Sequence, residues 1–179
     1  MRTEELVKIA GSISKNETEA AKIAVHLANL FDVIIPERIG EDFAKAISLQ
    51  DMSAAVRACA EYYRNRADYN VSGISAKGVY DSVIADNASL GIMREINIDW
   101  VFPDGEVDYL FDPTAINGPI NHEWLWQFNR HSYWTHMARK YKDCGDEKYA
   151  QAFKRQLLKW VIQTDIPKSW NGPGSAWRT

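Results

Sequence analysis

The first half of the chain carries apolar residues at helical spacing. After Ile23, apolar side chains recur at i+4, i+7 and i+8, which is one face of an amphipathic helix. Asn16 can cap this helix, and Glu19 stands three positions further on, as in a capping box. Pro36 ends it. Similar patterns predict helices over 41–49, from residue 51 onward and over 80–92, with a small, polar loop over 71–78.

The second half predicts two longer helices joined by a tight link. Apolar and aromatic positions predict one continuous helix over 123–141, buried on two sides, and a partner helix over 147–163. Gly145 suits a left-handed C-terminal position and Asp146 can cap the next helix, so the two form an αα-hairpin. A Gly- and Pro-containing loop follows from residue 169. One stripe of the partner helix holds Tyr149, Phe153, Leu157 and Trp160.

The chain divides into three predicted segments, an N-terminal helical segment (1–96), an aromatic-rich loop (97–122) and the hairpin with its following loop (123–179). The aromatic content of the middle segment favours a packed loop over a disordered one. No strand pattern and no internal repeat is visible, so the predicted fold class is all-α. A hairpin that is apolar on both sides needs further helices, and we therefore expect the 179 residues to begin a longer protein.

Composition and charge exclude several classes of protein. Hydrophobic residues make up 46% of the chain and charged residues 25%, which is typical of a globular protein. The net charge of −3 provides no basic field for a nucleic acid, so an anionic ligand would need a local cluster of cations. No apolar run is long enough to span a membrane, and the N-terminus lacks the apolar core of a signal peptide. Cys59 and Cys144 are expected to be buried free thiols.

Aromatic residues point to a candidate site in the second half. All seven tryptophans follow residue 99, and residues 121–134 combine them with amide, imidazole and guanidinium groups. Such a mixture suits a sugar, because aromatic rings can cover its C–H faces while Arg and Asn bind hydroxyl and acid groups. The alternative is that the Trp side chains are ordinary helix core. The candidates on this segment are Trp126, Asn129, Arg130 and His131.

Other chemistries find no support in the residue pattern. His122, His131 and His136 have the wrong spacing for a metal site, and there is no GxGxxG or P-loop, so no metal or cofactor is expected. Glu123 is a lone carboxylate, which does not favour glycoside hydrolysis by a carboxylate pair. Consecutive residues on a helix point in different directions, so at most two of residues 129–131 can serve one site.

Taken together, residues 124–131, Trp134, the turn 145–149, Trp160 and the loop 170–178 resemble the N-terminal helical domain of the heparinase II/III family. The resemblance is specific over 120–179, loose over 80–119 and compositional before that. It implies the N-terminal part of an incomplete (α/α) toroid built from helical hairpins, with further helices and a β-sandwich domain in the same protein. The implied activity is β-elimination on a uronate-containing glycosaminoglycan of the heparan sulfate type.

The resemblance also limits what this chain is expected to do. The family's catalytic residues lie in later helices and in the β domain, and no position here matches them, so we expect no catalytic residue and no activity from this chain alone. Its matching positions are expected to form the wall of a cleft for an acidic polysaccharide, in a periplasmic or secreted protein. The alternative is a non-catalytic carbohydrate-binding or protein-interaction module. Those positions are Trp126, Asn129, Arg130 and His131 on the helix and Trp177 and Arg178 in the loop.

Overall fold

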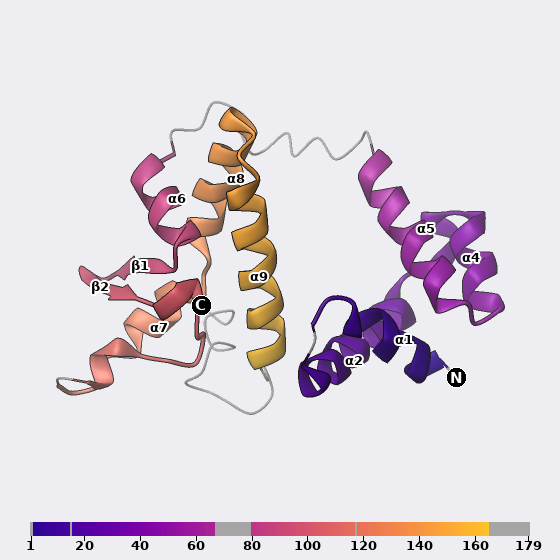
Figure 1. Ribbon diagram of the computed structural model, residues 1–179, viewed down its shortest axis with the longest axis horizontal. Coiled ribbons are helices and arrows are strands. Elements are labelled where there is room, and N and C mark those ends of the chain that lie inside the picture. Colours follow the sequence, from indigo (N-terminus) through magenta and orange to yellow (C-terminus); the bar gives the residue numbers. More distant parts are fainter. Residues whose placement is uncertain (1, 15, 67–79, 117, 165–179) are drawn as a thin grey trace. The chain divides into compact units, whose positions relative to one another are not determined.

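The computed structural model describes residues 2–14, 16–66, 80–116 and 118–164, and these belong to two compact units, each with the elements shown in Figure 1. Most of the described residues are helical, and their strands form one two-stranded sheet. The first unit contains α1 (Arg2–Gly11), α2 (Glu17–Val33), α3 (Pro36–Ile39), α4 (Glu41–Ser48) and α5 (Met52–Asn65). The second contains α6 (Ser82–Ser89), β1 (Ile92–Glu95), β2 (Ile98–Val101), η1 (Pro103–Gly105), η2 (Pro113–Ala115), α7 (Glu123–Phe128), α8 (Ser132–Cys144) and α9 (Glu147–Gln163).

Helix starts in the first unit follow the capping signals in the sequence. The Asn16 side chain accepts a hydrogen bond from the Glu19 amide at 3.1 Å, which confirms the predicted cap. The Glu19 carboxylate does not return to Asn16 directly, but accepts from the Ser14 hydroxyl at 2.8 Å, and that hydroxyl oxygen accepts from the Asn16 amide. The predicted helices over 41–49 and from residue 51 are also present, as α4 and α5.

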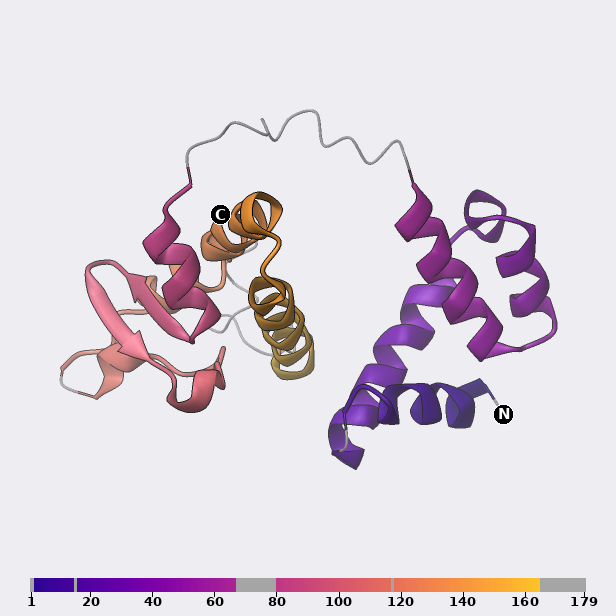
Figure 2. The same cartoon turned by 45° about the horizontal axis from the view of Figure 1, so that its top comes forward.

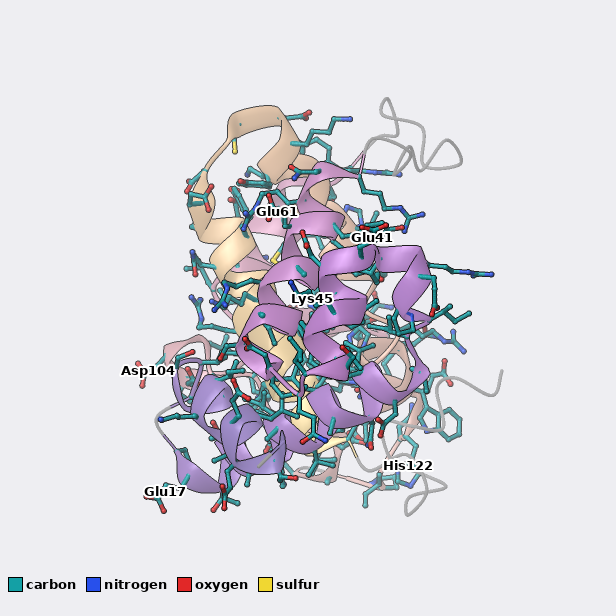
Figure 3. All side chains as sticks on the ribbon, turned by 90° about the vertical axis from the view of Figure 1, so that its right-hand side faces the viewer. Glu17, Glu41, Lys45, Glu61, Asp104 and His122 are labelled. Carbon is teal, nitrogen blue, oxygen red and sulfur yellow. The ribbon has the colours of Figure 1, made fainter. Side chains whose placement is uncertain are left out.

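One aromatic pair and one carboxylate join helices of the first unit. Phe31 of α2 and Phe43 of α4 meet edge to face, with ring centroids 5.6 Å apart. The Glu5 carboxylate on α1 accepts hydrogen bonds from the first two amides of α5, which lowers the pKa of Glu5. Glu41 and Glu61 lie at the same end of α4 and α5 and line a cavity of about 440 Å³ (Figure 3).

In the second unit, α6, α8 and α9 pack together, and the β1–β2 hairpin joins α6 and α7 (Figure 2). The hairpin corrects the expectation that the chain has no strands, and it also ends the predicted 80–92 helix early. The register pairs Ile92 with Val101 and Glu95 with Ile98. The Trp124 indole N–H donates to the Ile98 carbonyl at 3.2 Å and attaches the hairpin to α7.

Backbone geometry explains why the sequence pattern does not indicate the β1–β2 hairpin. Its two turn residues, Ile96 and Asn97, both have positive φ (45° and 64°), as a two-residue hairpin turn of the favoured kind requires. Ile is an unusual residue in that conformation, so the sequence lacks the Asn-Gly signature of such turns. Gly91 precedes the hairpin with φ +77°, and a Cβ there would lie 2.8 Å from the Gly105 Cα.

The continuous helix predicted over 123–141 is wrong. The structure has two helices, α7 and α8, separated at residues 129–131, with His131 in the left-handed region (φ 57°, ψ 29°). The last turn of α7 is narrower than an α-helical turn, because the amides of Arg130 and His131 bond the carbonyls three residues back. The reversal at His131 changes the direction of every later side chain, so Ala138, which a continuous helix would place on the same side as Trp124, is exposed.

The αα-hairpin itself is confirmed, but α9 is rotated about its axis, so that it buries a different side from the predicted one. Gly145 has φ 68° and its amide bonds the Tyr141 carbonyl, while the Asp146 side chain accepts from the Lys148 amide. The buried stripe of α9 differs from the predicted one, since Phe153 is 38% exposed. That stripe consists of Tyr149, Ala152 and Gln156.

Cys59 is buried as predicted, whereas Cys144, at the end of α8, is exposed. The predicted packing of the 97–122 segment is confirmed at Phe102 and Tyr109, which are both buried. Across the ranges given above, no helix is long and apolar enough to cross a membrane. The predicted loops over 71–78 and from residue 169 lie outside the described residues.

We expect Gly91→Ala to destabilise the second unit by about 3 kcal/mol, because it adds strain at a positive φ and displaces the Gly105 backbone. Gly145→Ala is the control, since its φ is also positive but nothing lies within 4 Å of the added Cβ, and we expect a loss of about 1 kcal/mol. Urea unfolding followed by tryptophan fluorescence measures both, because all seven tryptophans follow residue 99. Equal losses would show that the close approach to Gly105 does not matter.

Candidate functional site

Asn129 is a buried structural residue at the C-terminal end of α7. Its side chain is 1% exposed and all of its hydrogen-bonding groups are directed inward. The amide Nδ2 donates to the Leu125 carbonyl at 2.9 Å and to the Tyr109 carbonyl at 3.4 Å. Its Oδ1 accepts from the Trp160 indole at 3.1 Å. Asn129 therefore connects three segments of the second unit and offers no free group to a ligand.

His131 is buried like Asn129 and contacts the rings of Tyr109, Tyr133, Trp134 and Trp160. We call this group of six residues the buried layer. Its ring stacks on Trp134 with a centroid distance of 3.9 Å and an interplanar angle of 8°, and it meets the edge of Trp160 at 5.0 Å. Its Nδ1 lies 3.1 Å from the Tyr133 hydroxyl, which itself donates to Tyr109. The other ring nitrogen, Nε2, is buried without a hydrogen-bond partner.

Burial controls the protonation of this layer. Loss of hydration lowers the pKa of His131 to about 4, so the ring is neutral at physiological pH. The same cause raises the pKa values of Tyr109 and Tyr133. A neutral, enclosed imidazole cannot attract an anionic ligand, and His131 is thus placed to hold the break between α7 and α8.

Helix α9 completes the layer with polar side chains on its inner face. The Gln156 carbonyl oxygen accepts from the Trp134 indole at 2.9 Å, and its amide donates to the Ala88 carbonyl on α6 at 2.7 Å. Trp160 lies about one helical turn after Gln156, and its indole N–H donates to Asn129. Gln163 lies about one turn further on, and its side-chain oxygen accepts from the Tyr109 amide. The glutamines explain why α9 buries a stripe different from the purely apolar one.

Arg130 and Trp126 are the remaining described candidates, and they are more accessible. Arg130 is exposed and its guanidinium donates to the Gln127 side chain at 3.0 Å. Trp126 is half-buried, and its ring lies nearly parallel to that of His122 at 6.2 Å. The Trp126 Nε1 is enclosed without a hydrogen-bond partner. The three consecutive motif residues therefore divide, with Asn129 and His131 inside and only Arg130 directed outward.

Trp177 and Arg178 lie outside the described residues. Among the residues that are described, no group of three or more His, Cys, Asp or Glu side chains could hold a metal ion. His122 lies 3.9 Å from the Asp112 carboxylate, a pair that is ionic only when the imidazole is protonated.

A cavity that the sequence did not predict lies between α6, the β1–β2 hairpin and the start of α8. Its volume is about 660 Å³, and its wall combines apolar side chains of α6 and β1 with the carboxyl groups of Asp81, Glu95 and Asp99. Arg94 is its one basic lining residue and is paired with Asp99 at 3.5 Å. Burial raises the pKa of Glu95 to about 7. This acidic cavity is unsuited to an anionic sugar. Its wall includes residues of the β1–β2 hairpin, and because the sequence pattern predicts no strands, it does not predict this cavity either.

We expect Asn129→Ala to destabilise the second unit by about 3 kcal/mol, because it leaves the Trp160 indole and the Tyr109 carbonyl without their partner and creates a cavity. Arg130→Ala, one residue away but exposed, should change stability by no more than about 0.5 kcal/mol. Urea unfolding followed by tryptophan fluorescence gives both values. Similar values for the two variants would contradict the division into a buried and an exposed motif residue.

Stability should depend on pH through His131. Because the folded state lowers its pKa from 6.5 to about 4, the unfolded chain binds the proton first as the pH falls. The stability contributed by the neutral ring is complete above pH 6.5 and is lost as the pH falls towards 4. The melting temperature should therefore fall less steeply over this interval in His131→Asn, a change that keeps a residue tolerant of positive φ.

Glu95 provides a control of opposite sign. Its pKa is raised from 4.5 to about 7, so its contribution is complete below pH 4.5 and is lost as the pH rises through 7. Glu95→Gln should therefore raise the melting temperature at pH 8 relative to the unchanged protein and have little effect at pH 4.5. Parallel pH profiles for the unchanged protein and both variants would show that neither burial affects stability.

Comparison with known proteins gives a consistent result. Residues 30–179 match the sequence model of the family described as heparinase II/III N-terminus. A heparin-sulfate lyase from Bacteroides stercoris is 26% identical over 170 residues, which cover 91% of this chain and 24% of that protein. A heparin-sulfate lyase from Pedobacter heparinus is 26% identical over 157 residues, 83% of this chain and 24% of its own length. No solved structure matches significantly.

This chain therefore spans about a quarter of the length of the curated relatives that it matches. The family match covers both the aromatic motif on α7 and α8 and the α9 partner helix, and it extends well into the first unit. On that match, the chain belongs to the heparinase II/III family and corresponds to its N-terminal region.

Proposed function

We propose that this chain is the N-terminal domain of a polysaccharide lyase that cleaves a uronate-containing glycosaminoglycan of the heparan sulfate type by β-elimination. The observation that carries the proposal is the similarity to two heparin-sulfate lyases over most of the chain. The family match over 30–179 supports the same assignment. The chain supplies helices to an incomplete (α/α) toroid, and further helices and a β-sandwich domain complete the protein, which is periplasmic or secreted.

Within that enzyme, Arg130 contributes to the wall of the substrate cleft. Arg130 supports this role because its guanidinium is directed outward from a rigid, buried anchor formed by its two neighbours. A guanidinium binds carboxylate or sulfate through a planar pair of donors. Trp126, half-buried beside His122, can add an aromatic surface. Trp177 and Arg178 are proposed for the same wall from the sequence motif.

The chemistry itself is assigned to other parts of the protein. β-Elimination requires neutralisation of the uronate carboxylate, a base at C5 and an acid at the departing O4. Asn129 and His131 suit none of these tasks, because both are buried and His131 lacks access to a substrate. We therefore propose that the 179 residues alone have no lyase activity. A non-catalytic carbohydrate-binding or interaction module is the alternative function.

The decisive experiment measures the full-length protein against heparan sulfate. We expect the release of 4,5-unsaturated uronate, detected by its ultraviolet absorbance, and none from the 179-residue chain alone. Heparin, hyaluronan and alginate serve as parallel substrates to define the glycan. A full-length protein that binds heparan sulfate but releases no unsaturated product would favour the non-catalytic module.

In the active enzyme, Arg130→Ala should raise KM by about tenfold, because one charge-assisted hydrogen bond to substrate is lost. The turnover number and the melting temperature should change little, since Arg130 is exposed. Lys142→Ala, which removes an exposed cation near the end of α8, is the matched control and should leave KM unchanged. An unchanged KM in Arg130→Ala would place the cleft elsewhere.

A further inference from the structure

Charge is distributed unevenly along the second unit. Residues 80–122, which form α6, the hairpin and the following loop, contain eight acidic side chains and one basic side chain. Residues 123–164, which form α7, α8 and α9, contain eight basic and four acidic side chains. The net charge of the whole chain conceals this division. A polyanion approaching this unit is repelled by one part and attracted by the other.

Helix α9 carries the most one-sided stretch. After Glu147, no acidic residue occurs as far as Thr164, while four basic residues do. The helix lies at the edge of its unit, with α6 and α8 packed against it (Figure 1, Figure 2). Its inner face is filled by Tyr149, Ala152 and Gln156, so the cations lie on the remaining part of its circumference.

Three of these four cations are not neutralised within the described part of the chain. Lys148 has carboxylate neighbours, since it lies 3.4 Å from Asp146 and 3.8 Å from Asp86. Lys154, Arg155 and Lys159 form no ion pair with a described residue. Lys154 and Arg155 are exposed, and Lys159 is half-buried.

Two of them lie on one side of the helix. Arg155 and Lys159 are separated by one helical turn, about 6 Å along the axis, whereas Lys154, one residue before Arg155, points about 100° away from it. Two like charges at i and i+4 destabilise a helix slightly when nothing compensates them. An anionic partner would remove this repulsion, and its charged groups could contact Arg155 and Lys159 from one direction.

We propose that Arg155 and Lys159 form a contact surface for the sulfate and carboxylate groups of a sulfated glycosaminoglycan chain. This inference rests on the proposed function, because that function supplies the polyanion. The two side chains belong to α9, whereas Arg130 lies in the break between α7 and α8. Clusters of cations also bind nucleic acid, so duplex DNA is the competing ligand in the test.

The test compares two matched double variants of the 179-residue chain. Arg155→Gln/Lys159→Gln removes one Arg and one Lys from α9. Arg57→Gln/Lys45→Gln removes the same pair from exposed positions on α5 and α4 (Figure 3 shows Lys45). Isothermal titration with a heparin-derived octasaccharide should show binding at least about tenfold weaker for the α9 variant, and unchanged binding for the control. The α9 variant should also lose part of the salt dependence of binding.

Two further ligands and one activity measurement separate the possible results. Hyaluronan, which has carboxylates but no sulfates, should bind more weakly than the heparin octasaccharide. Equal losses in both double variants, no binding by the unchanged chain, or duplex DNA binding as tightly as heparin would each overturn the assignment. A full-length protein that cleaves heparan sulfate with an unchanged KM in the α9 variant would overturn the surface and leave the lyase proposal intact.

Discussion

The arrangement of the second unit depends on one buried amide. Asn129 is enclosed among aromatic rings, where an unpaired polar group costs about 1–3 kcal/mol. Its three partners belong to the loop at Tyr109, to α7 at Leu125 and to α9 at Trp160. All three segments must be in place for the amide to be satisfied, so the break in the helix, the path of the aromatic-rich loop and the rotation of α9 are determined together.

Local signals predicted the features whose causes are local. The caps at Asn16 and Asp146, the left-handed Gly145 and the extent of α9 depend on residues within one or two turns, and the structure confirms them. The break between α7 and α8 has distant causes, since the partners of Asn129 are 20 and 31 residues away. Helical periodicity continues across the break and gives no sign of it.

The site shows the same limit. Residue types indicated correctly that residues 129–131 could not all face one ligand, but only tertiary packing decides which of them are enclosed. The cavity at Glu95 was beyond the sequence because it depends on the hairpin, whose turn places Ile96 at a positive φ. The charge division between 80–122 and 123–164 can be seen in the sequence, but which side of α9 is buried depends on packing, which encloses Tyr149, Ala152 and Gln156.

The two cysteines differ in a way that has a practical consequence. Cys59 is enclosed in the first unit, and this burial raises the pKa of its thiol. Cys144 is exposed at the turn between α8 and α9. Thiol-reactive reagents attack accessible thiolates, so a maleimide dye will label Cys144 selectively in the folded protein. The unmodified sequence thus already carries a single attachment point for an optical probe, one turn from the start of the cationic helix.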